Sequence, residues 1–117
     1  MAESRVLVVD DDDAVRSVTA EMLRRNHYDQ ESVSGGQAAL DLLGSSTFDL
    51  VLLDVGMPGL SGIETYQLLR QDLPTQKVLF MTGYAEENAL DLVNPHTFML
   101  AKPFTLKALT ETIKRIL

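Results

Sequence analysis

Short apolar runs alternate with amphipathic stretches five times along this chain, and no other feature constrains its fold as strongly. The runs lie at residues 6–9, 28–33, 50–53, 78–81 and 98–101, and the run at 28–33 is the weakest. Continuous runs of β-branched and aliphatic residues are typical of strands that are buried on both faces. Five such strands separated by helical segments predict an α/β fold, a doubly wound five-stranded parallel sheet flanked by five helices.

The segments that follow the runs carry apolar residues at helical spacing. They predict helices at 14–23, 34–43, 61–69 and 105–117, and a short, weakly patterned helix at 86–93. Ser34 and Gln37 have the spacing of a capping box, and Ser61 and Glu64 have the same spacing. We therefore expect these two serines to open the second and third helices.

The length of 117 residues suits one domain with one hydrophobic core, so residues 1–117 are expected to form a single domain. No linker or repeat interrupts the sequence, and because it ends with the fifth predicted helix, we expect no output domain within these 117 residues. No apolar run approaches the about 20 residues that a helix needs to cross a bilayer, so we expect no membrane insertion. The polar, acidic start does not resemble a secretory signal.

The composition excludes several classes of protein. A formal net charge of −7 argues against direct nucleic-acid binding, because phosphate backbones favour clustered Lys and Arg. The same charge permits metal cations or basic partner surfaces. The absence of cysteine excludes disulfides and thiolate metal sites, and it is consistent with the reducing cytoplasm, where we expect the chain to act.

Polar residues follow four of the five predicted strands. Ligands of open parallel sheets bind beyond the carboxyl ends of the strands, so these residues are expected to converge at one edge. They are Asp10 and Asp11 after the first strand, Asp54 after the third, Thr82 after the fourth and Lys102 after the fifth. The second strand delivers nothing distinctive.

This set of side chains suits phosphoryl transfer. Three clustered carboxylates repel one another, and a hard divalent cation, Mg²⁺ or Mn²⁺, would relieve the repulsion. Asp11 and Asp54 are expected to hold the metal together with a backbone carbonyl. The metal, Thr82 and Lys102 would each stabilise one phosphoryl oxygen. Asp54 is then the carboxylate nucleophile, and the product is an aspartyl phosphate.

Each of these residues also has an ordinary structural explanation. Asp10–Asp13 would suit the start of a helix, where the macrodipole favours acidic side chains. A single aspartate that ends a strand, as Asp54 does, is usually a turn or cap residue. Taken alone, Thr82 followed by Gly83 would suit an ordinary turn, and Lys102 followed by Pro103 would suit the end of a strand at the surface. Their occurrence together at four strand ends favours a functional site.

Four motifs resemble the receiver family of response regulators in order and spacing. They are Val8-Val9-Asp10-Asp11, Leu52-Leu53-Asp54-Val55-Gly56-Met57-Pro58-Gly59, Met81-Thr82-Gly83 and Lys102-Pro103-Phe104. The resemblance covers the whole chain and implies a phosphoacceptor domain of a two-component phosphorelay. It implies a phosphohistidine donor on a histidine kinase or histidine phosphotransfer protein, a downstream output domain or protein, and the strand order 2-1-3-4-5.

The same resemblance implies a role for each matched residue. Asp54 would be the phosphoacceptor and Asp11 a direct metal ligand. Asp10 would hold a metal-bound water, and the Gly56 carbonyl would be a further ligand. Thr82 and Lys102 would be the residues that bind the phosphoryl group and switch the conformation, with a cis peptide bond between Lys102 and Pro103.

The sequence departs from the family pattern in two places. Met99 occupies the position of the family's switch aromatic, so the coupling of an aromatic to Thr82 is expected to be altered or absent. The alternative is that Met99 simply packs in the core. Phe98 cannot substitute for that aromatic, because adjacent side chains of a strand face opposite sides. The segment between Thr82 and Lys102 is short, as in receivers attached to hybrid histidine kinases, and this puts dimerisation through the fourth and fifth helices in doubt. His96 in this segment is expected to be a turn or surface residue.

Two further residues are candidates for setting the lifetime of the phosphoryl group. We expect Tyr84 to shield Asp54 partly and Gly56 to leave access for water. A Tyr84→Ala variant that dephosphorylates at the wild-type rate would contradict the first part.

Three other functions are less consistent with this sequence. A pseudo-receiver would keep the fold as an interaction module without the chemistry, and the complete set of acids, Thr82 and Lys102 argues against it. A phosphatase of the haloacid dehalogenase type needs a second Asp two residues after the nucleophile, where this chain has Gly56. A flavodoxin-like nucleotide binder is excluded because four aspartates after the first strand would repel a phosphate. We therefore expect a stoichiometric phosphoacceptor with slow self-dephosphorylation rather than an enzyme, although its parent chain could be a hybrid histidine kinase.

Overall fold

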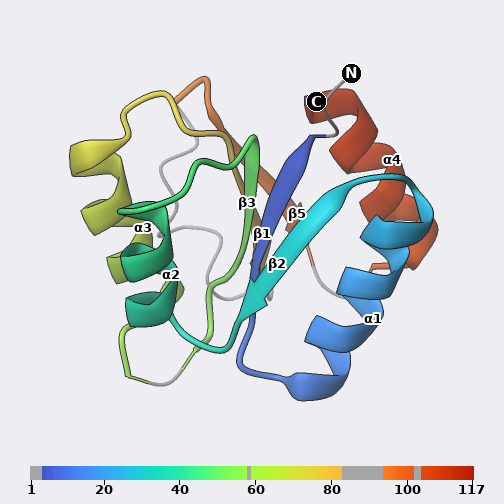
Figure 1. The fold of residues 1–117 in the computed structure, drawn as a ribbon, viewed down its shortest axis with the longest axis horizontal. Helices are drawn as coiled ribbons and strands as arrows, with labels where there is room; N and C mark the ends of the chain where they lie inside the picture. Colours follow the sequence, from blue (N-terminus) through green and yellow to red (C-terminus); the bar gives the residue numbers. More distant parts are fainter. Residues whose placement is uncertain (1–3, 58, 83–93, 102–103) are drawn as a thin grey trace.

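The protein folds around a five-stranded sheet in which all neighbouring strands are parallel (Figure 1). The computed structural model describes residues 4–57, 59–82, 94–101 and 104–117, and for Thr82 it describes the backbone alone. The strands are β1 (Arg5–Val9), β2 (Asp29–Val33), β3 (Leu50–Asp54), β4 (Val78–Thr82) and β5 (Thr97–Ala101). Their order in the sheet, β2-β1-β3-β4-β5, confirms the predicted topology.

Helices cover both faces of the sheet. They are α1 (Asp13–Arg25), α2 (Gly36–Leu43), α3 (Gly62–Asp72) and α4 (Leu106–Ile116). In Figure 1, α1 and α4 lie on one side of the sheet, and α2 and α3 lie on the other. Among the described residues there are thus four of the five predicted helices, and the helix expected at 86–93 lies outside them. No helix in the described part of the chain is long and apolar enough to cross a membrane.

The starts of the helices follow from local capping. The Ser61 hydroxyl accepts from the Glu64 backbone N–H, and the Glu64 side chain accepts from the Ser61 backbone N–H, which confirms the predicted capping box of α3. The capping box predicted for Ser34 and Gln37 is wrong. Helix α2 is capped by Gly35 without a side-chain hydrogen bond, so Gln37 lies one position too early in the helix to close the box.

The core is divided by the sheet into two apolar clusters. Val6, Val8, Leu50 and Leu52 pack with α1 and α4, in a cluster that includes Leu23, Leu109 and Ile113. The alternate residues Leu7, Val9, Val51 and Leu53 pack with α2 and α3, in a cluster that includes Ala39, Tyr66 and Leu69. Because β1 and β3 are buried between helices on both faces, their carboxyl ends are held in fixed positions.

The edge strands explain the weaker parts of the sequence pattern. β2 is largely exposed and pairs with the sheet only through β1, so it needs fewer apolar residues than a central strand. On β5, Phe98 packs against the cluster that contains α1 and α4. Met99 is half-buried and pairs in register with Phe80, which belongs to the opposite cluster. Phe98 and Met99 therefore face opposite sides of the sheet, as predicted.

Candidate functional site

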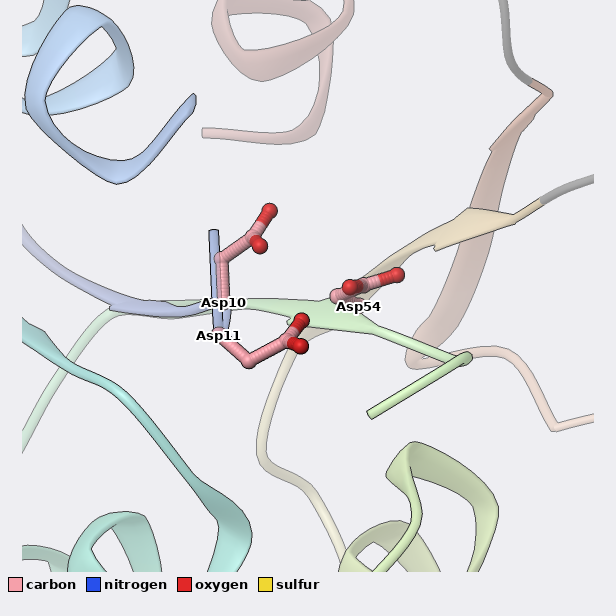
Figure 2. A group of neighbouring side chains, drawn as sticks. All are labelled: Asp10, Asp11 and Asp54. Carbon is pink, nitrogen blue, oxygen red and sulfur yellow. The ribbon is translucent and has the colours of Figure 1, made fainter. Parts of the chain in front are cut away.

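Three carboxylates meet where β1 and β3 end. One carboxylate oxygen from each of Asp10, Asp11 and Asp54 lies within 4.8 Å of the others. Figure 2 shows the three side chains at the ends of these neighbouring strands, with the Asp11 carboxylate reaching toward Asp54. The pairing of Val9 with Leu53 places the next residue of each segment, Asp10 and Asp54, side by side. The parallel register thus produces the convergence that strand-end positions predict.

Asp54 is held firmly at the end of β3. Asp54 is buried, with only 6% of its surface exposed. The next residue, Val55, donates its backbone N–H to the carbonyl of Met81 at 3.2 Å, which ties this strand end to β4. The Gly56 backbone N–H donates to Oδ1 of Asp54 at 3.3 Å, a long hydrogen bond that restricts rotation of the carboxylate.

The loop after β1 places the other two acids. The backbone N–H of Asp10 donates to the carbonyl of Val33 on β2 at 3.2 Å. Oδ1 of Asp10 accepts the backbone N–H of Asp12 at 2.9 Å, so Asp10 also organises the loop that carries Asp11. Asp10 is 1% exposed, whereas Asp11 is exposed. Asp11 is therefore the acid through which solvent reaches the cluster.

The four consecutive aspartates have two different roles. The alternative explanation, that they form the start of a helix, is correct for two of them. Asp12 is the N-cap of α1 and accepts from the N–H groups of Ala14 and Val15. Asp13 is the acidic residue of the first turn. Asp10 and Asp11 instead belong to the cluster with Asp54.

The donor set fits a hard divalent cation. Three carboxylates within 4.8 Å repel one another unless a cation or a proton neutralises them. Carboxylate oxygens suit Mg²⁺, Mn²⁺ or Ca²⁺ and are poor matches for soft metals. The exposed Asp11 leaves an open side, as a site needs if its metal retains water or meets a substrate.

Several of the predicted site residues stay predictions. Thr82 ends β4 and its backbone pairs with Ala101 of β5, while its side chain, Tyr84, Lys102 and the Lys102-Pro103 bond lie outside the described residues. The role of the Gly56 carbonyl as a ligand also stays a prediction. His96 lies in the turn before β5, as expected, and its backbone N–H donates to Oδ1 of Asn94 at 2.8 Å.

Two residues near the acids were not identified from the sequence. The backbone of Gly62 at the start of α3 lies against the carbonyl of Asp54. The Arg16 guanidinium reaches back from α1 to the carbonyl of Asp10. The one available signal for Gly62 was its position directly after the helix-opening Ser61, and Arg16 had only its helical spacing of three residues from Asp13.

Comparison with known proteins identifies the class. The model of the response regulator receiver domain family matches residues 6–114. This chain belongs to that family, whose members are the phosphoacceptor domains of two-component signalling systems. The assignment agrees with the parallel sheet of order β2-β1-β3-β4-β5 and with the acid cluster at its carboxyl edge.

The relatives include a protein of about the same length and proteins that are several times longer. The chain is 30% identical to the sporulation initiation phosphotransferase F of Bacillus subtilis, over 100% of this chain and 96% of that protein. It is 34% identical to the response regulator protein FleR of Pseudomonas aeruginosa and 36% identical to the sensor kinase CckA of Brucella abortus, over 96% of this chain in both cases. It spans 24% of FleR and 12% of CckA, so it corresponds to a fraction of those two proteins.

Solved structures share the fold closely. The chemotaxis protein CheY4 of Vibrio cholerae superposes with a TM-score of 0.89 at 27% identity, over 99% of this chain and 100% of that one. The response regulator TrrA of Thermotoga maritima, solved in complex with Mg²⁺-BeF, gives a TM-score of 0.88 at 30% identity, over 97% of this chain and 99% of that one.

Proposed function

We propose that this domain accepts a phosphoryl group on Asp54 from a phosphohistidine on a histidine kinase or histidine phosphotransfer protein. The observation that carries the proposal is the meeting of Asp10, Asp11 and Asp54 within 4.8 Å at the carboxyl edge of the sheet. An isolated strand-end aspartate would be a turn residue, but two further acids beside it make a charge cluster that needs a cation.

In this proposal Asp10, Asp11, Asp54 and the Gly56 carbonyl hold Mg²⁺, with Mn²⁺ as a substitute. The metal would neutralise the carboxylates and the incoming phosphoryl oxygens, which otherwise repel one another. The complex of TrrA with Mg²⁺-BeF supports this choice of ion, because TrrA is 30% identical to this chain and has the same fold.

The residues of the chain would contribute to the transfer mainly by orienting the attacking carboxylate and the phosphoryl group. A carboxylate oxygen of Asp54 attacks phosphorus, the new P–O bond forms as the P–N bond to the donor imidazole breaks, and the imidazole nitrogen keeps the electron pair. The hydrogen bond from the Gly56 N–H to Oδ1 favours one orientation of the carboxylate for this attack. Thr82 and Lys102 are proposed to bind the phosphoryl oxygens that the attack leaves charged.

An apolar surface beside the acids suits docking of the donor protein. Val15 and Val18 on α1 and Leu106 on α4 are exposed by 38%, 49% and 45%. With Ala14, Thr19 and Phe104 they line a hollow of about 270 Å³. Because α1 begins two residues after Asp11, a protein that covers this hollow would lie on the helix that follows the acid cluster.

We further propose that the domain is a stoichiometric acceptor with slow self-dephosphorylation, acts in the cytoplasm and passes its state to an output domain or protein rather than to nucleic acid. The relatives support an output either in a separate protein or in the same chain, because one of them has about the length of this chain and a sensor kinase is several times longer. The net charge of −7 supports the proposal that the domain does not act on nucleic acid, because phosphate backbones repel an acidic protein.

The test is phosphorylation by acetyl phosphate in the presence of Mg²⁺, followed by intact-protein mass spectrometry. The wild-type chain should gain one phosphoryl group, and Asp54→Asn should gain none. Asp49→Asn is a matched control because Asp49 is an exposed aspartate at the opposite end of β3, and it should be labelled like the wild type. A wild type that neither binds Mg²⁺ nor becomes labelled would instead identify a pseudo-receiver.

A further inference from the structure

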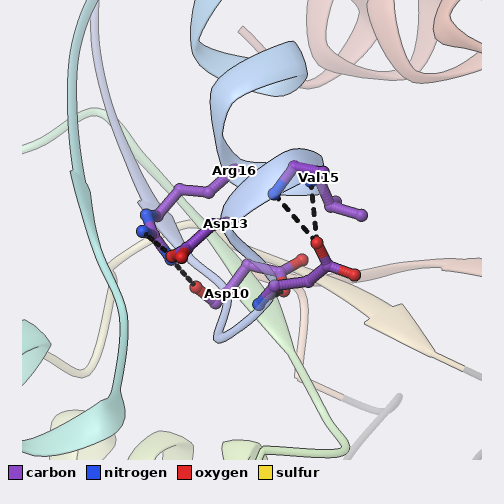
Figure 3. A network of polar contacts seen from close by, with 6 residues as sticks. Asp10, Asp13, Val15 and Arg16 are labelled. Carbon is purple, nitrogen blue, oxygen red and sulfur yellow. Dashed lines mark hydrogen bonds and ion pairs between the residues drawn. The ribbon is translucent and has the colours of Figure 1, made fainter.

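Arg16 connects α1 to the loop that carries the acids (Figure 3). Its Nη1 donates to the carbonyl oxygen of Asp10 at 2.8 Å. Its Nη2 forms an ion pair and hydrogen bond with Oδ1 of Asp13. The Arg16 side chain is only 20% exposed, whereas the basic residues Arg24 and Arg25 of the same helix are 67% and 76% exposed. Arg16 is thus an inward-directed cation on a helix whose other arginines in the last turn face solvent.

The contact with Asp10 fixes the peptide group from which Asp11 projects. That peptide consists of the Asp10 carbonyl and the Asp11 N–H, so a hydrogen bond to the carbonyl sets its rotation. The backbone N–H of Asp10 is already bonded to β2, and its side chain is bonded to the N–H of Asp12. With Arg16 on the remaining carbonyl, donors and acceptors on three different segments hold this one residue.

The second contact makes the bond to the carbonyl more specific. Asp13 lies one turn before Arg16 on α1, so its carboxylate orients the guanidinium from within the same helix. The planar guanidinium can then serve Asp10 and Asp13 at once, which an ammonium with its rotating N–H groups does less well. The pair also keeps the Arg16 charge partly compensated.

We propose that Arg16 is a positioning residue for the metal site: it holds the Asp10–Asp11 peptide so that the Asp11 carboxylate meets Asp10 and Asp54. This inference rests on the proposed function, because it concerns the ion that the three acids are proposed to bind. Arg16 is not proposed to contact the phosphoryl group or the metal. Its effect passes through the backbone of Asp10.

The sign of the effect distinguishes positioning from simple charge. Arg16 is a cation near an acidic cluster, so by Coulomb's law alone its removal would strengthen binding of another cation. If Arg16 instead holds the ligands in place, its removal weakens binding. The two explanations predict opposite changes in the same dissociation constant.

The experiment is titration of the unphosphorylated chain with Mn²⁺, followed by electron paramagnetic resonance of the free ion. Arg16→Gln should weaken Mn²⁺ binding by about 10-fold or more, as expected when a group that orients metal ligands is lost. Arg16→Lys keeps the charge but has a single donor nitrogen in place of the planar guanidinium, and its affinity should lie between that of Arg16→Gln and the wild type. Arg24→Gln removes the same charge from the exposed end of α1, and it should bind Mn²⁺ within about twofold of the wild type because salt screens distant charges.

Circular dichroism melting of each variant without metal separates ligand placement from folding. The titrations are run at a temperature where all the variants are folded, and there a purely structural role would leave the dissociation constant unchanged. If Arg16→Gln does not fold, Arg16→Lys tests the same contact, and it should weaken binding less than tenfold but measurably. Because lysine keeps the positive charge, Coulomb's law alone predicts no change for this variant. Equal or tighter binding by the Arg16 variants overturns the inference.

The outcome also separates this inference from the proposed function. If the wild type binds Mn²⁺ and is labelled on Asp54, but the Arg16 variants bind as the wild type does, only the positioning role is wrong. If the wild type binds no Mn²⁺, the metal site of the proposed function fails, and the inference about Arg16 fails with it.

Discussion

The backbone of Gly62 packs directly against the carbonyl of Asp54. A Cβ added at position 62 would lie 2.2 Å from the Asp54 carbonyl oxygen and 2.6 Å from Cα of Val55. The Gly62 N–H also donates to the Val55 carbonyl at 3.1 Å. The first residue of α3 and the end of β3 therefore form a single unit, and the proposed phosphoacceptor cannot shift its backbone without moving α3.

Replacing this glycine should destabilise the domain. We expect Gly62→Ala to lower the free energy of unfolding by about 1–3 kcal/mol, because the methyl group meets backbone that can relax only by separating α3 from β3. The measurement is urea denaturation followed by circular dichroism. Gly35→Ser is the matched control, since a Cβ at Gly35 meets nothing within 4 Å and serine is favoured at this N-cap. Equal stability of Gly62→Ala and the wild type would contradict the close contact.

Mg²⁺ should stabilise the folded protein through the acid cluster. A ligand that binds only the native state adds about 2.7 kcal/mol at 100 times its dissociation constant, so the melting temperature should rise with Mg²⁺ and fall back with a chelator. Asp11→Asn should remove most of this dependence, because it takes one of the three carboxylates from the cluster. Asp41→Asn, an exposed change on α2, should keep it. A Mg²⁺-dependent rise of the wild-type size in Asp11→Asn would mean that the ion binds elsewhere.

The apolar hollow beside the acids should matter for protein donors alone. We expect Val18→Glu to slow phosphoryl transfer from a phosphorylated histidine phosphotransfer protein by about 10-fold, the effect of losing about 1.4 kcal/mol of docking free energy. Labelling by acetyl phosphate should be unchanged, because this small donor does not cover the hollow. Leu68→Glu is the control, since Leu68 is 42% exposed but lies on α3, on the other face of the sheet. Equal slowing by both variants would argue against docking at α1.

A buried polar contact joins α3 to β5 and should be measurable as a coupling energy. The hydroxyl groups of Tyr66 and Thr97 lie 2.7 Å apart, and Arg70 donates to both of them. Tyr66→Phe should cost about 1–2 kcal/mol of stability, because it removes a buried hydrogen-bonding group from this network. A double-mutant cycle with Thr97→Val should give a coupling of at least about 0.5 kcal/mol. Strict additivity would show that the contact contributes nothing to holding β5 against α3.

The sequence predicted the sheet well where burial dictates the pattern. β1 and β3 are central strands covered on both faces, so their residues must be apolar throughout, and continuous runs are the result. β2 lies at the edge of the sheet and is largely exposed, so it needs fewer apolar residues and left a weak signal. The capping box predicted for Ser34 and Gln37 was wrong because the distance between these two residues in the sequence does not show where the helix begins. The N-cap of α2 is Gly35, one residue after Ser34.

The residue types of the site followed from the sequence, and their relation to one another came from the fold. Asp10, Asp11 and Asp54 were identifiable because each follows an apolar run at a strand end, a local property of the chain. That their oxygens lie within 4.8 Å depends on the pairing of Val9 with Leu53, which joins segments more than 40 residues apart. Arg16 and Gly62 had no distinctive local pattern, because their roles consist of one guanidinium contact and one close backbone approach.

By itself, then, the sequence determined the alternation of strands and helices, the family and the acids at the strand ends, since burial and strand-end chemistry are written in local residue order. Only the tertiary structure decided that Asp12 and Asp13 serve the helix while Asp10 and Asp11 serve the cluster. Four consecutive aspartates look alike in the sequence. They differ once the backbone turns from β1 into α1 and directs two carboxylates to the helix N-terminus and two toward Asp54.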